Sequence, residues 1–163
     1  MSDKQEVSLK VNGENYHREI EPRTLLSDFI RHDLALTGTH VGCEHGICGS
    51  CTILVDGLPV RSCLMFAVQA EGKSIETVES LATDGQLSVL QNAFWENQGL
   101  QCGFCTSGIL MSMKAFLEEN PNPSREDIRE ALSGNLCRCT GYHDIVDSVA
   151  AAAESLTSSG ATR

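Results

Sequence analysis

The first stretch of the chain alternates between apolar and polar residues. Val7, Leu9 and Val11 are separated by polar residues, and the alternation resumes after an Asn12-Gly13 pair. Side chains of a strand point alternately to its two faces, so this pattern is typical of a half-buried strand. Asn-Gly is a favoured two-residue turn between antiparallel strands. The pattern therefore predicts an N-terminal β-hairpin.

A stretch with helical periodicity follows this hairpin. Leu25, Leu26, Phe29 and Ile30 recur three or four positions apart, which places them on one face of a helix. Thr24 directly precedes them, and threonine is a favoured residue at the N-cap. We therefore predict one helix here, capped by the Thr24 side chain.

The rest of the first half returns to short strand patterns. Residues 37–51 contain four glycines, which disfavour a helix there. Two runs, 52–55 and 59–61, flank an Asp-Gly turn and predict a second hairpin, and residues 74–78 fit a last strand. Several strands with one helix predict a small α+β domain over residues 1–80.

The second half follows helical periodicity throughout. The helical stretches are 86–97, 106–119, a segment that begins after Ser124, and 141–156. Ser124 and Asp127 have the spacing of a capping box, which predicts the start of the third helix. Four helices predict a small four-helix bundle over residues 81–156, and residues 157–163 are expected to form a flexible tail.

The composition adds an acidic balance to this picture. Lys and Arg total 12 against 22 Asp and Glu, which gives a formal charge of −10. No basic stretch offers a footprint for nucleic acid, so no nucleic-acid partner is expected. The acidity fits a partner with a basic or polar docking surface, and it fits simple solubility equally well.

The expected cellular compartment decides how the cysteines are interpreted. The N-terminal sequence lacks the apolar segment of a secretory signal, and no run reaches the roughly 18 apolar residues of a membrane span. We therefore expect a cytoplasmic protein without a membrane span. In the cytoplasm, cysteine patterns serve metal or redox chemistry more often than disulfides. The chain has eight cysteines.

Four cysteines lie in the first half, and three of them fall within nine residues. This first quartet is Cys43, Cys48, Cys51 and Cys63. The spacing C-x4-C-x2-C is that of plant-type [2Fe–2S] ferredoxins. Gly46 and Gly49 allow the tight winding and let N–H groups approach cluster sulfurs. A zinc site fits this spacing poorly, and a Rieske centre is disfavoured because no C-x-x-H follows.

The other four cysteines lie in the second half as two close pairs. This second quartet is Cys102, Cys105, Cys137 and Cys139. The first pair directly precedes a predicted helix, whose dipole is expected to lower the thiol pKa values and favour thiolates. On the residues alone, a zinc site with four cysteine ligands remains open beside an iron–sulfur cluster.

Four sequence motifs, taken in order, resemble one family. The motifs are GCEHGICGSC at 42–51, RSC at 61–63, GLQCGFCTSG at 99–108 and GNLCRCTGY at 134–142. Together they resemble the small iron–sulfur subunit of the molybdenum hydroxylases, the family of xanthine dehydrogenase, aldehyde oxidoreductase, carbon monoxide dehydrogenase and the N-heteroaromatic hydroxylases. The resemblance runs from about Val7 to Ala153.

The resemblance implies a fold and a cofactor for each half. It implies a β-grasp ferredoxin-like domain followed by a four-helix bundle, each with one [2Fe–2S] cluster, which argues against zinc in the second quartet. Gln101 and Cys139 match positions that touch the pterin in family members. Ser107 stands where the family commonly has proline, and we expect this change to leave the cluster intact.

The resemblance also implies partners and a direction of electron flow. A large subunit with molybdopterin cytosine dinucleotide is expected beside the second quartet, and a medium FAD subunit beside the first, in a dimer of heterotrimers. This chain would pass electrons from molybdenum to FAD while the complex oxidises a small molecule. An N-heteroaromatic compound is the preferred substrate, with carbon monoxide or an aldehyde next.

The chain itself offers no catalytic residue. It has no molybdenum ligand set, no flavin- or dinucleotide-binding fingerprint and no catalytic acid–base pair. Its histidines, including His40, are interpreted as surface or packing residues. Two other functions remain as alternatives: a free-standing two-cluster ferredoxin and a zinc-stabilised interaction module.

Overall fold

The sheet half (residues 4–80) is built on five strands, in a computed structural model that describes residues 4–159. The strands are β1 (Gln5–Val11), β2 (Glu14–Ile20), β3 (Thr52–Val55), β4 (Leu58–Arg61) and β5 (Ser74–Glu76). They form one sheet in the order β2-β1-β5-β3-β4. Only β1 and β5 pair in parallel, and the other neighbours are antiparallel.

Both predicted hairpins are confirmed. Asn12 and Gly13 join β1 to β2 with φ of 51° and 87°, and Asp56 and Gly57 join β3 to β4 with φ of 51° and 81°. Two consecutive left-handed residues match the twist of a two-residue hairpin, and Asn, Asp and Gly tolerate that conformation. The alternating apolar residues of β1 are buried in the core of this half.

The helix after β2 lies close to its predicted position, but Thr24 does not cap it. α1 (Leu26–Asp28) continues as a π-helical turn, η1 (Phe29–Asp33), and Leu25 is the N-cap residue without a side-chain bond. The Leu26 N–H donates to the Met65 carbonyl oxygen at 2.7 Å. The prediction for Thr24 is wrong because a distant segment, rather than a neighbouring hydroxyl, satisfies the first helical N–H.

Short 3-10 turns complete the connections. They are η2 (Ser62–Leu64), η3 (Ala67–Ala70), η4 (Val78–Ser80) and η5 (Leu132–Gly134). The last strand of the sheet therefore ends at Glu76, two residues before its predicted end, because the chain turns into η4.

The helical half (residues 81–159) holds four helices. They are α2 (Val89–Glu96), α3 (Thr106–Glu119), α4 (Arg125–Ala131) and α5 (His143–Ser159). α3 has its predicted bounds, and Ser124 caps α4 through the predicted capping box with Asp127. Of the expected tail, α5 includes residues 157–159, and residues 160–163 lie outside the described part of the chain. Among the described helices, none is long and apolar enough to cross a membrane.

Two helix starts differ from the sequence pattern for local reasons. α2 begins three residues later than predicted because Ser88 forms a capping box with Gln91, which fixes the first turn. α5 begins at His143 rather than Gly141 because Gly141 and Tyr142 both have positive φ, 63° and 69°. A right-handed helix cannot include residues in that conformation.

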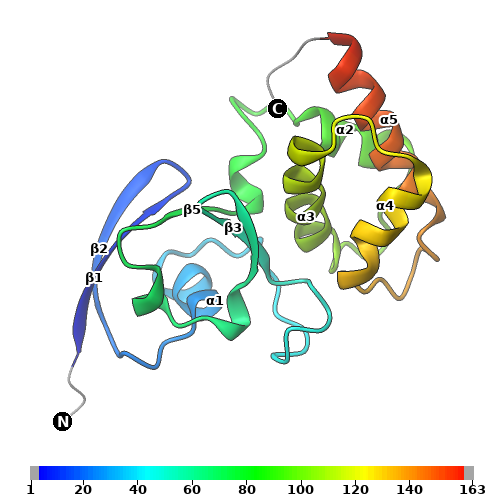
Figure 1. Ribbon diagram of the computed structural model, residues 1–163. Coiled ribbons are helices and arrows are strands. Elements are labelled where there is room, and N and C mark those ends of the chain that lie inside the picture. The colour runs from blue at the N-terminus through cyan, green and yellow to red at the C-terminus, as the bar shows by residue number, and fades with distance from the viewer. Residues whose placement is uncertain (1–3, 160–163) are drawn as a thin grey trace.

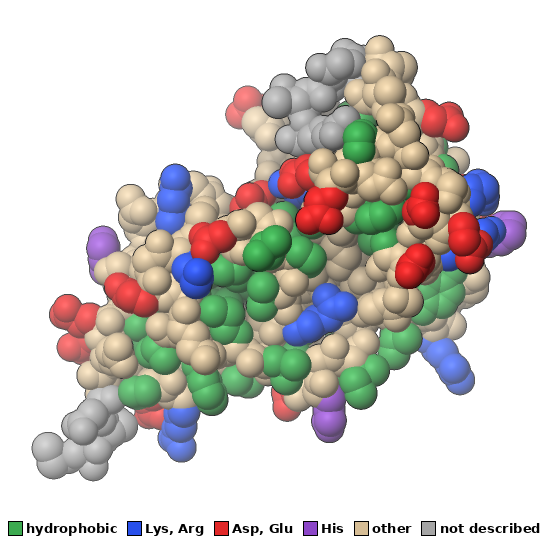
Figure 2. Space-filling view, viewed as in Figure 1, with side chains coloured by type: hydrophobic (Ala, Val, Ile, Leu, Met, Phe, Trp, Pro, Cys, Tyr) green, Lys and Arg blue, Asp and Glu red, His purple; other side chains and the backbone are tan. Residues whose placement is uncertain are grey.

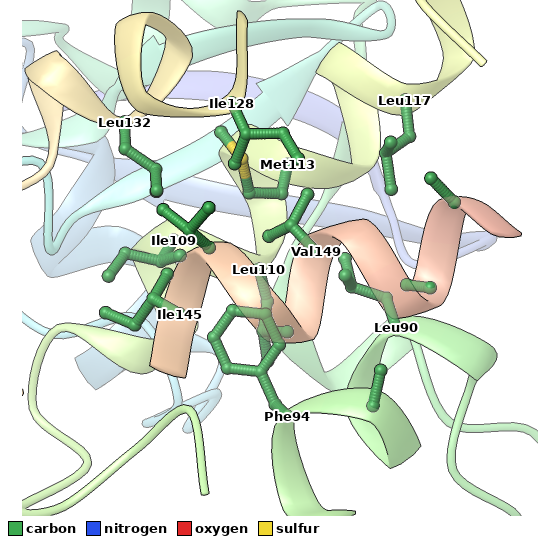
Figure 3. Close-up of a cluster of buried hydrophobic side chains, with 14 of the residues drawn as sticks. Leu90, Phe94, Ile109, Leu110, Met113, Leu117, Ile128, Leu132, Ile145 and Val149 are labelled. Atoms are coloured by element: carbon green, nitrogen blue, oxygen red, sulfur yellow. The ribbon is translucent and has the colours of Figure 1, made fainter. Parts of the chain in front are cut away.

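Each half has its own hydrophobic core. In the helical half, all four helices contribute apolar side chains to one cluster (Figure 3). The core of the sheet half lies between the sheet and α1 (Figure 1). Burial of one large apolar side chain stabilises a fold by about 1.5–3 kcal/mol. Because each half has a core of its own, each half can hold its own cysteine quartet in place.

Helix α3 joins the halves because it packs on the sheet as well as on the helical core. Leu54 of β3 forms a small buried cluster with Met111 and Ala115 of α3, and α3 lies beside β3 in Figure 1. A Cβ atom at Gly108 would lie 2.1 Å from the Gly49 carbonyl oxygen, so glycine permits this approach. The fold is a β-grasp domain followed by a four-helix bundle, as predicted.

Candidate metal centres

Three cysteines of the first quartet lie on a loop without helix or strand between η1 and β3, and Cys63 lies in η2 after β4. Gly46 and Gly49 have φ of 75° and 76°, the left-handed conformation predicted for them. A Cβ atom at Gly46 would lie 2.3 Å from Cδ1 of Leu64, the residue after Cys63. Glycine therefore lets the loop close against the segment that carries the fourth cysteine.

Backbone N–H groups of this loop bond to the Cys43 sulfur. The N–H groups of Cys48 and His45 donate to Cys43 Sγ at 3.4 Å and 3.3 Å. These bonds lower the pKa of Cys43 to about 6, with the Cys48 N–H as the largest contribution. Cys43 is therefore a thiolate at neutral pH, the form that binds metal.

Two cysteines of the first quartet are shielded from solvent. Cys51 and Cys63 are buried, whereas Cys43 and Cys48 are half-buried. Burial, and then contact with the Cys51 thiol, raises the pKa of Cys63 to about 11. Metal binding at this site must release the proton of Cys63, because the thiolate is the ligand.

The second quartet is assembled from two loops that precede helices. Residues 97–105 lead into α3 with Cys102 and Cys105, and residues 135–142 lead into α5 with Cys137 and Cys139. Thiol contacts between Cys105 and Cys137, and between Cys102 and Cys139, bring the loops together. Because α3 and α5 share one core, their N-terminal ends meet at this site.

The thiols of the second quartet differ strongly in their surroundings. Cys105 is buried, which raises its pKa to about 12, whereas the Phe104 N–H lowers the pKa of the exposed Cys102. The prediction that the helix end lowers the pKa is wrong for Cys105, because burial outweighs the helix dipole there. Contact with Cys102 raises the pKa of Cys139, which is also exposed.

The segment that carries Cys137 and Cys139 is held by hydrogen bonds from side-chain hydroxyl groups. The Tyr142 hydroxyl accepts a hydrogen bond from the Cys137 N–H (2.9 Å) and donates to the Asn135 carbonyl oxygen (3.1 Å). The Thr140 hydroxyl donates to Cys137 Sγ at 3.1 Å. Burial raises the pKa of Cys137, but bonds from Thr140 and Cys139 outweigh it and lower the pKa overall.

The two cysteine sites touch each other directly. The Leu136 N–H, next to Cys137, donates to the Cys48 carbonyl oxygen at 2.8 Å. The buried Asn135 side chain donates to the Gly49 carbonyl oxygen at 3.2 Å. One hydrogen bond therefore links a cysteine of the first quartet to the neighbour of a cysteine in the second.

A stacked aromatic pair forms a second link between the sites. His40 stacks on Phe104 with ring centroids 5.0 Å apart, and His40 Nδ1 lies 2.9 Å from the Phe104 carbonyl oxygen. The Ser107 hydroxyl lies 3.5 Å from the same ring nitrogen. His40 is therefore a packing residue, as predicted, and Ser107 is buried inside the chain.

Each site offers the donor set of an iron–sulfur cluster. Both offer four thiols, and the first adds N–H donors and a loop whose glycines leave room beside the sulfurs. Within residues 4–159, no three His, Cys, Asp or Glu side chains stand close enough to hold one metal ion. The fit to a [2Fe–2S] cluster therefore rests on the donor set, since four thiolates are its ligands, and not on side chains already gathered around a single ion.

Exposed apolar side chains flank the cysteines of both sites. Four large hydrophobic residues on the cysteine segments are exposed: Ile47 (65%), Leu64 (59%), Leu136 (51%) and Phe104 (47%). Figure 2 shows hydrophobic side chains in a band along the lower edge of the molecule. Exposed apolar patches mark surfaces that bind other proteins. Gln101 is also exposed and directly precedes the exposed Cys102.

Sequence reasoning missed the residues that hold the loops together. Arg61, Asn135 and Tyr142 bond to backbone groups near the cysteines. Arg61 lies inside the quoted RSC motif, and Asn135 and Tyr142 lie inside GNLCRCTGY, so these motifs are the signals that could have drawn attention to them.

Two family models match consecutive parts of the chain. One is described as a 2Fe-2S iron-sulfur cluster binding domain and matches residues 9–82. The other is described as a [2Fe-2S] binding domain and matches residues 77–150. Each matched segment contains one complete quartet, so the chain has two [2Fe–2S]-binding domains.

Curated relatives match the chain over most of its length. The gamma subunit of caffeine dehydrogenase from Pseudomonas sp. (strain CBB1) is 59% identical, over 88% of this chain and 87% of its own. The small subunit of nicotine 6-hydroxylase from Paenarthrobacter nicotinovorans is 55% identical, over 91% of this chain and 89% of its own.

Solved structures share the fold of both halves. Quinoline 2-oxidoreductase from Pseudomonas putida 86 has a chain that aligns with a TM-score of 0.93 and 52% identity, over 96% of this chain and 98% of that chain. Aldehyde oxidoreductase from Desulfovibrio desulfuricans ATCC 27774 aligns with a TM-score of 0.91 and 42% identity, over 94% of this chain but 17% of that chain.

Proposed function

Because the chain belongs to the small [2Fe–2S] subunits of the molybdenum hydroxylases, we propose that it carries electrons from a molybdopterin centre to FAD. The molybdopterin cytosine dinucleotide is on a large partner subunit and the FAD on a medium one. The observation that carries the proposal is the contact of the two quartets through the Cys48 carbonyl and the Leu136 N–H. Each bound [2Fe–2S] cluster supplies one-electron transfer.

The proposed ligands are the two quartets defined above. Within the first, the Cys48 and His45 N–H groups stabilise the Cys43 thiolate, and burial of Cys51 and Cys63 keeps water from that side. Within the second, Tyr142 holds the loop between Asn135 and Cys137. The chain thus orients and shields its sites, and it performs no bond-making chemistry itself.

The exposure of the thiols supports the proposed direction of electron flow. Cys102 and Cys139 are exposed together with Gln101, and we assign this edge to the large subunit, with Gln101 and Cys139 against the pterin. The first quartet is rimmed by the exposed Ile47 and Leu64, and we assign that edge to the FAD subunit. Electrons then pass from the second quartet to the first.

The proposed substrate class is an N-heteroaromatic compound. The similar proteins named for caffeine, nicotine and quinoline all act, by their names, on nitrogen heterocycles. The full assembly is a dimer of heterotrimers in the cytoplasm, where thiolate ligands stay reduced. Substrate selection lies with the large subunit, which holds the molybdopterin.

Purification of the native complex tests the function. We expect this chain to co-purify with a molybdenum subunit and a flavin subunit, with about four irons and four acid-labile sulfides per chain. An N-heteroaromatic substrate should reduce both clusters and give two distinct EPR signals. A stable lone chain that is active without large partners would favour a free-standing ferredoxin. Zinc in place of iron would refute the cluster assignment.

A further inference from the structure

The side chain of Arg61 connects the two cysteine sites. Arg61 ends β4 and is half-buried, and its Nη2 donates to the Gly134 carbonyl oxygen at 2.6 Å. Its Nη1 donates to the Thr52 hydroxyl oxygen at 2.5 Å. Thr52 follows Cys51, and Gly134 lies three residues before Cys137. One guanidinium therefore bonds beside a cysteine of each quartet.

The surroundings of Arg61 leave little freedom for these bonds. The Gly49 carbonyl oxygen accepts bonds from the Thr52 N–H (3.1 Å), the Thr52 hydroxyl (2.6 Å) and the Asn135 amide (3.2 Å). A Cβ atom at Gly134 would lie 2.8 Å from Arg61 Nη2. The planar guanidinium meets two acceptors at once, which a lysine ammonium on a flexible stem does not reproduce.

The guanidinium of Arg61 places a positive charge against Thr52 and Gly134, which lie close in sequence to cysteines of the two quartets. A [2Fe–2S] core with four thiolates carries a charge of about −2 when oxidised and gains another negative charge on reduction. A nearby positive charge therefore favours the reduced form and raises the reduction potential. Arg138 lies between two cysteines but is exposed, so water screens its charge more strongly.

We propose that Arg61 is a positioning residue that holds the two cysteine loops at one spacing and raises the reduction potentials of both clusters. The inference rests on the proposed function, since it requires a cluster in each quartet. Electron transfer between the sites depends on the distance between the two clusters and on the difference between their reduction potentials. The inference assigns an influence on both quantities to the Arg61 side chain.

The test is an EPR-monitored redox titration of the native complex with three variants. In Arg61→Gln we expect both midpoint potentials to shift to more negative values and the magnetic interaction between the two reduced clusters to weaken. In Arg61→Lys we expect potentials close to those of the unaltered complex, because the charge remains, with a weakened magnetic interaction, because the two-acceptor contact is lost.

Lys114→Met is the matched control. Lys114 of α3 also links the halves, through an ion pair with Glu76 of β5 at 3.3 Å, but it bonds to neither cysteine loop. This variant loses one positive charge and one link, and we expect neither potentials nor magnetic interaction to change. Unchanged potentials in Arg61→Gln, or equal shifts in Lys114→Met, would overturn the inference.

The outcomes separate this inference from the proposed function. If the unaltered complex lacks two EPR signals, the proposed function fails. If both signals are present and Arg61→Gln leaves them unchanged, only the role of Arg61 fails. If Arg61→Gln loses a cluster, the Arg61→Lys variant becomes the test. Midpoint potentials that stay unchanged in Arg61→Lys, with a weaker magnetic interaction between its two clusters, support the role of Arg61. Any other result in Arg61→Lys refutes it.

Discussion

The two cysteine quartets are built in different ways. The first takes three ligands from nine consecutive residues, and N–H groups of the same loop bond to Cys43. The second joins two loops that are distant in sequence, and the side chains of Tyr142 and Thr140 support it. A local loop can wind itself around a cluster, whereas a site made from two loops depends on the packing of α3 and α5 that brings them together.

The difference also appears in exposure. In the first quartet, each cysteine is at least half-buried, whereas Cys102 and Cys139 of the second are exposed. A site that is open at one edge suits exchange of electrons with a cofactor outside the chain. The contact between the quartets is the hydrogen bond from the Leu136 N–H to the Cys48 carbonyl oxygen. The following changes are expected to separate the two kinds of site, from the largest effect to the smallest.

Removal of one ligand should abolish one site and spare the other. In Cys48→Ser we expect loss of about half of the iron and of one EPR signal, because the first cluster loses a thiolate while the helical core stays intact. Cys105→Ser is the reciprocal variant and should remove the other signal. Iron analysis and EPR of the native complex measure both. Loss of both signals in Cys48→Ser would contradict independent sites.

Crowding of the contact between the halves should disturb both sites at once. In Gly108→Ala, the new methyl group would lie 2.1 Å from the Gly49 carbonyl oxygen, so α3 must move away from the first cysteine loop. We expect a loss of about 1–3 kcal/mol in the free energy of unfolding, with changes in both EPR signals.

Ser112→Ala, also in α3, is the control for this change. The Ser112 hydroxyl is buried and has no hydrogen-bond partner in the described residues, so its removal should change the free energy of unfolding by less than about 1 kcal/mol. Denaturant unfolding of the cluster-loaded protein compares the two variants. Equal stability of both variants would show that the Gly108 contact is not needed.

The same contrast explains what the sequence could predict. Periodicity and turn residues predicted the hairpins, α3 and the start of α4, because these signals are local. The spacing of the first quartet pointed to its cluster for the same reason. For the second quartet, the spacing leaves both a zinc site and an iron–sulfur cluster open, because the spacing within each cysteine pair does not show how the two pairs meet. The family motifs favour the cluster.

Apart from the two helix starts, which have local causes, the errors and omissions come from contact between distant segments. Thr24 is not the cap because the Met65 carbonyl, far along the chain, accepts from the first helical N–H. The pKa of Cys105 is raised because the helical core buries it. Arg61 bonds to Gly134, 73 positions away, and no local pattern marks such a pair.

Loss of one hydroxyl should weaken the second site alone. Tyr142→Phe leaves the Cys137 N–H and the Asn135 carbonyl without their shared partner, which costs about 0.5–1.5 kcal/mol for each lost part-buried hydrogen bond. We expect faster loss of iron to a chelator, with selective decay of the second EPR signal. Tyr16→Phe is the control, since its hydroxyl bonds only to the exposed Glu14. Equal decay of both signals would contradict this dependence on side chains.

The mildest test compares Cys43 with Cys105 in the metal-free chain and changes only the pH. The pKa of Cys43 is lowered to about 6 by loop N–H groups, and that of Cys105 is raised to about 12 by burial. Since alkylating reagents attack thiolates, Cys43 should react rapidly at pH 7, and its rate should fall about tenfold per unit below pH 6.

Cys105 should stay unreactive throughout that range, because its thiol remains protonated well above pH 7. Mass spectrometry of peptides after brief treatment with iodoacetamide measures both rates in the same sample. If the two cysteines react alike, the metal-free loops do not keep the hydrogen bonds and burial described above. If only Cys43 reacts, the first loop already holds a thiolate for iron, whereas the second site must lose a proton from Cys105 as its cluster is inserted.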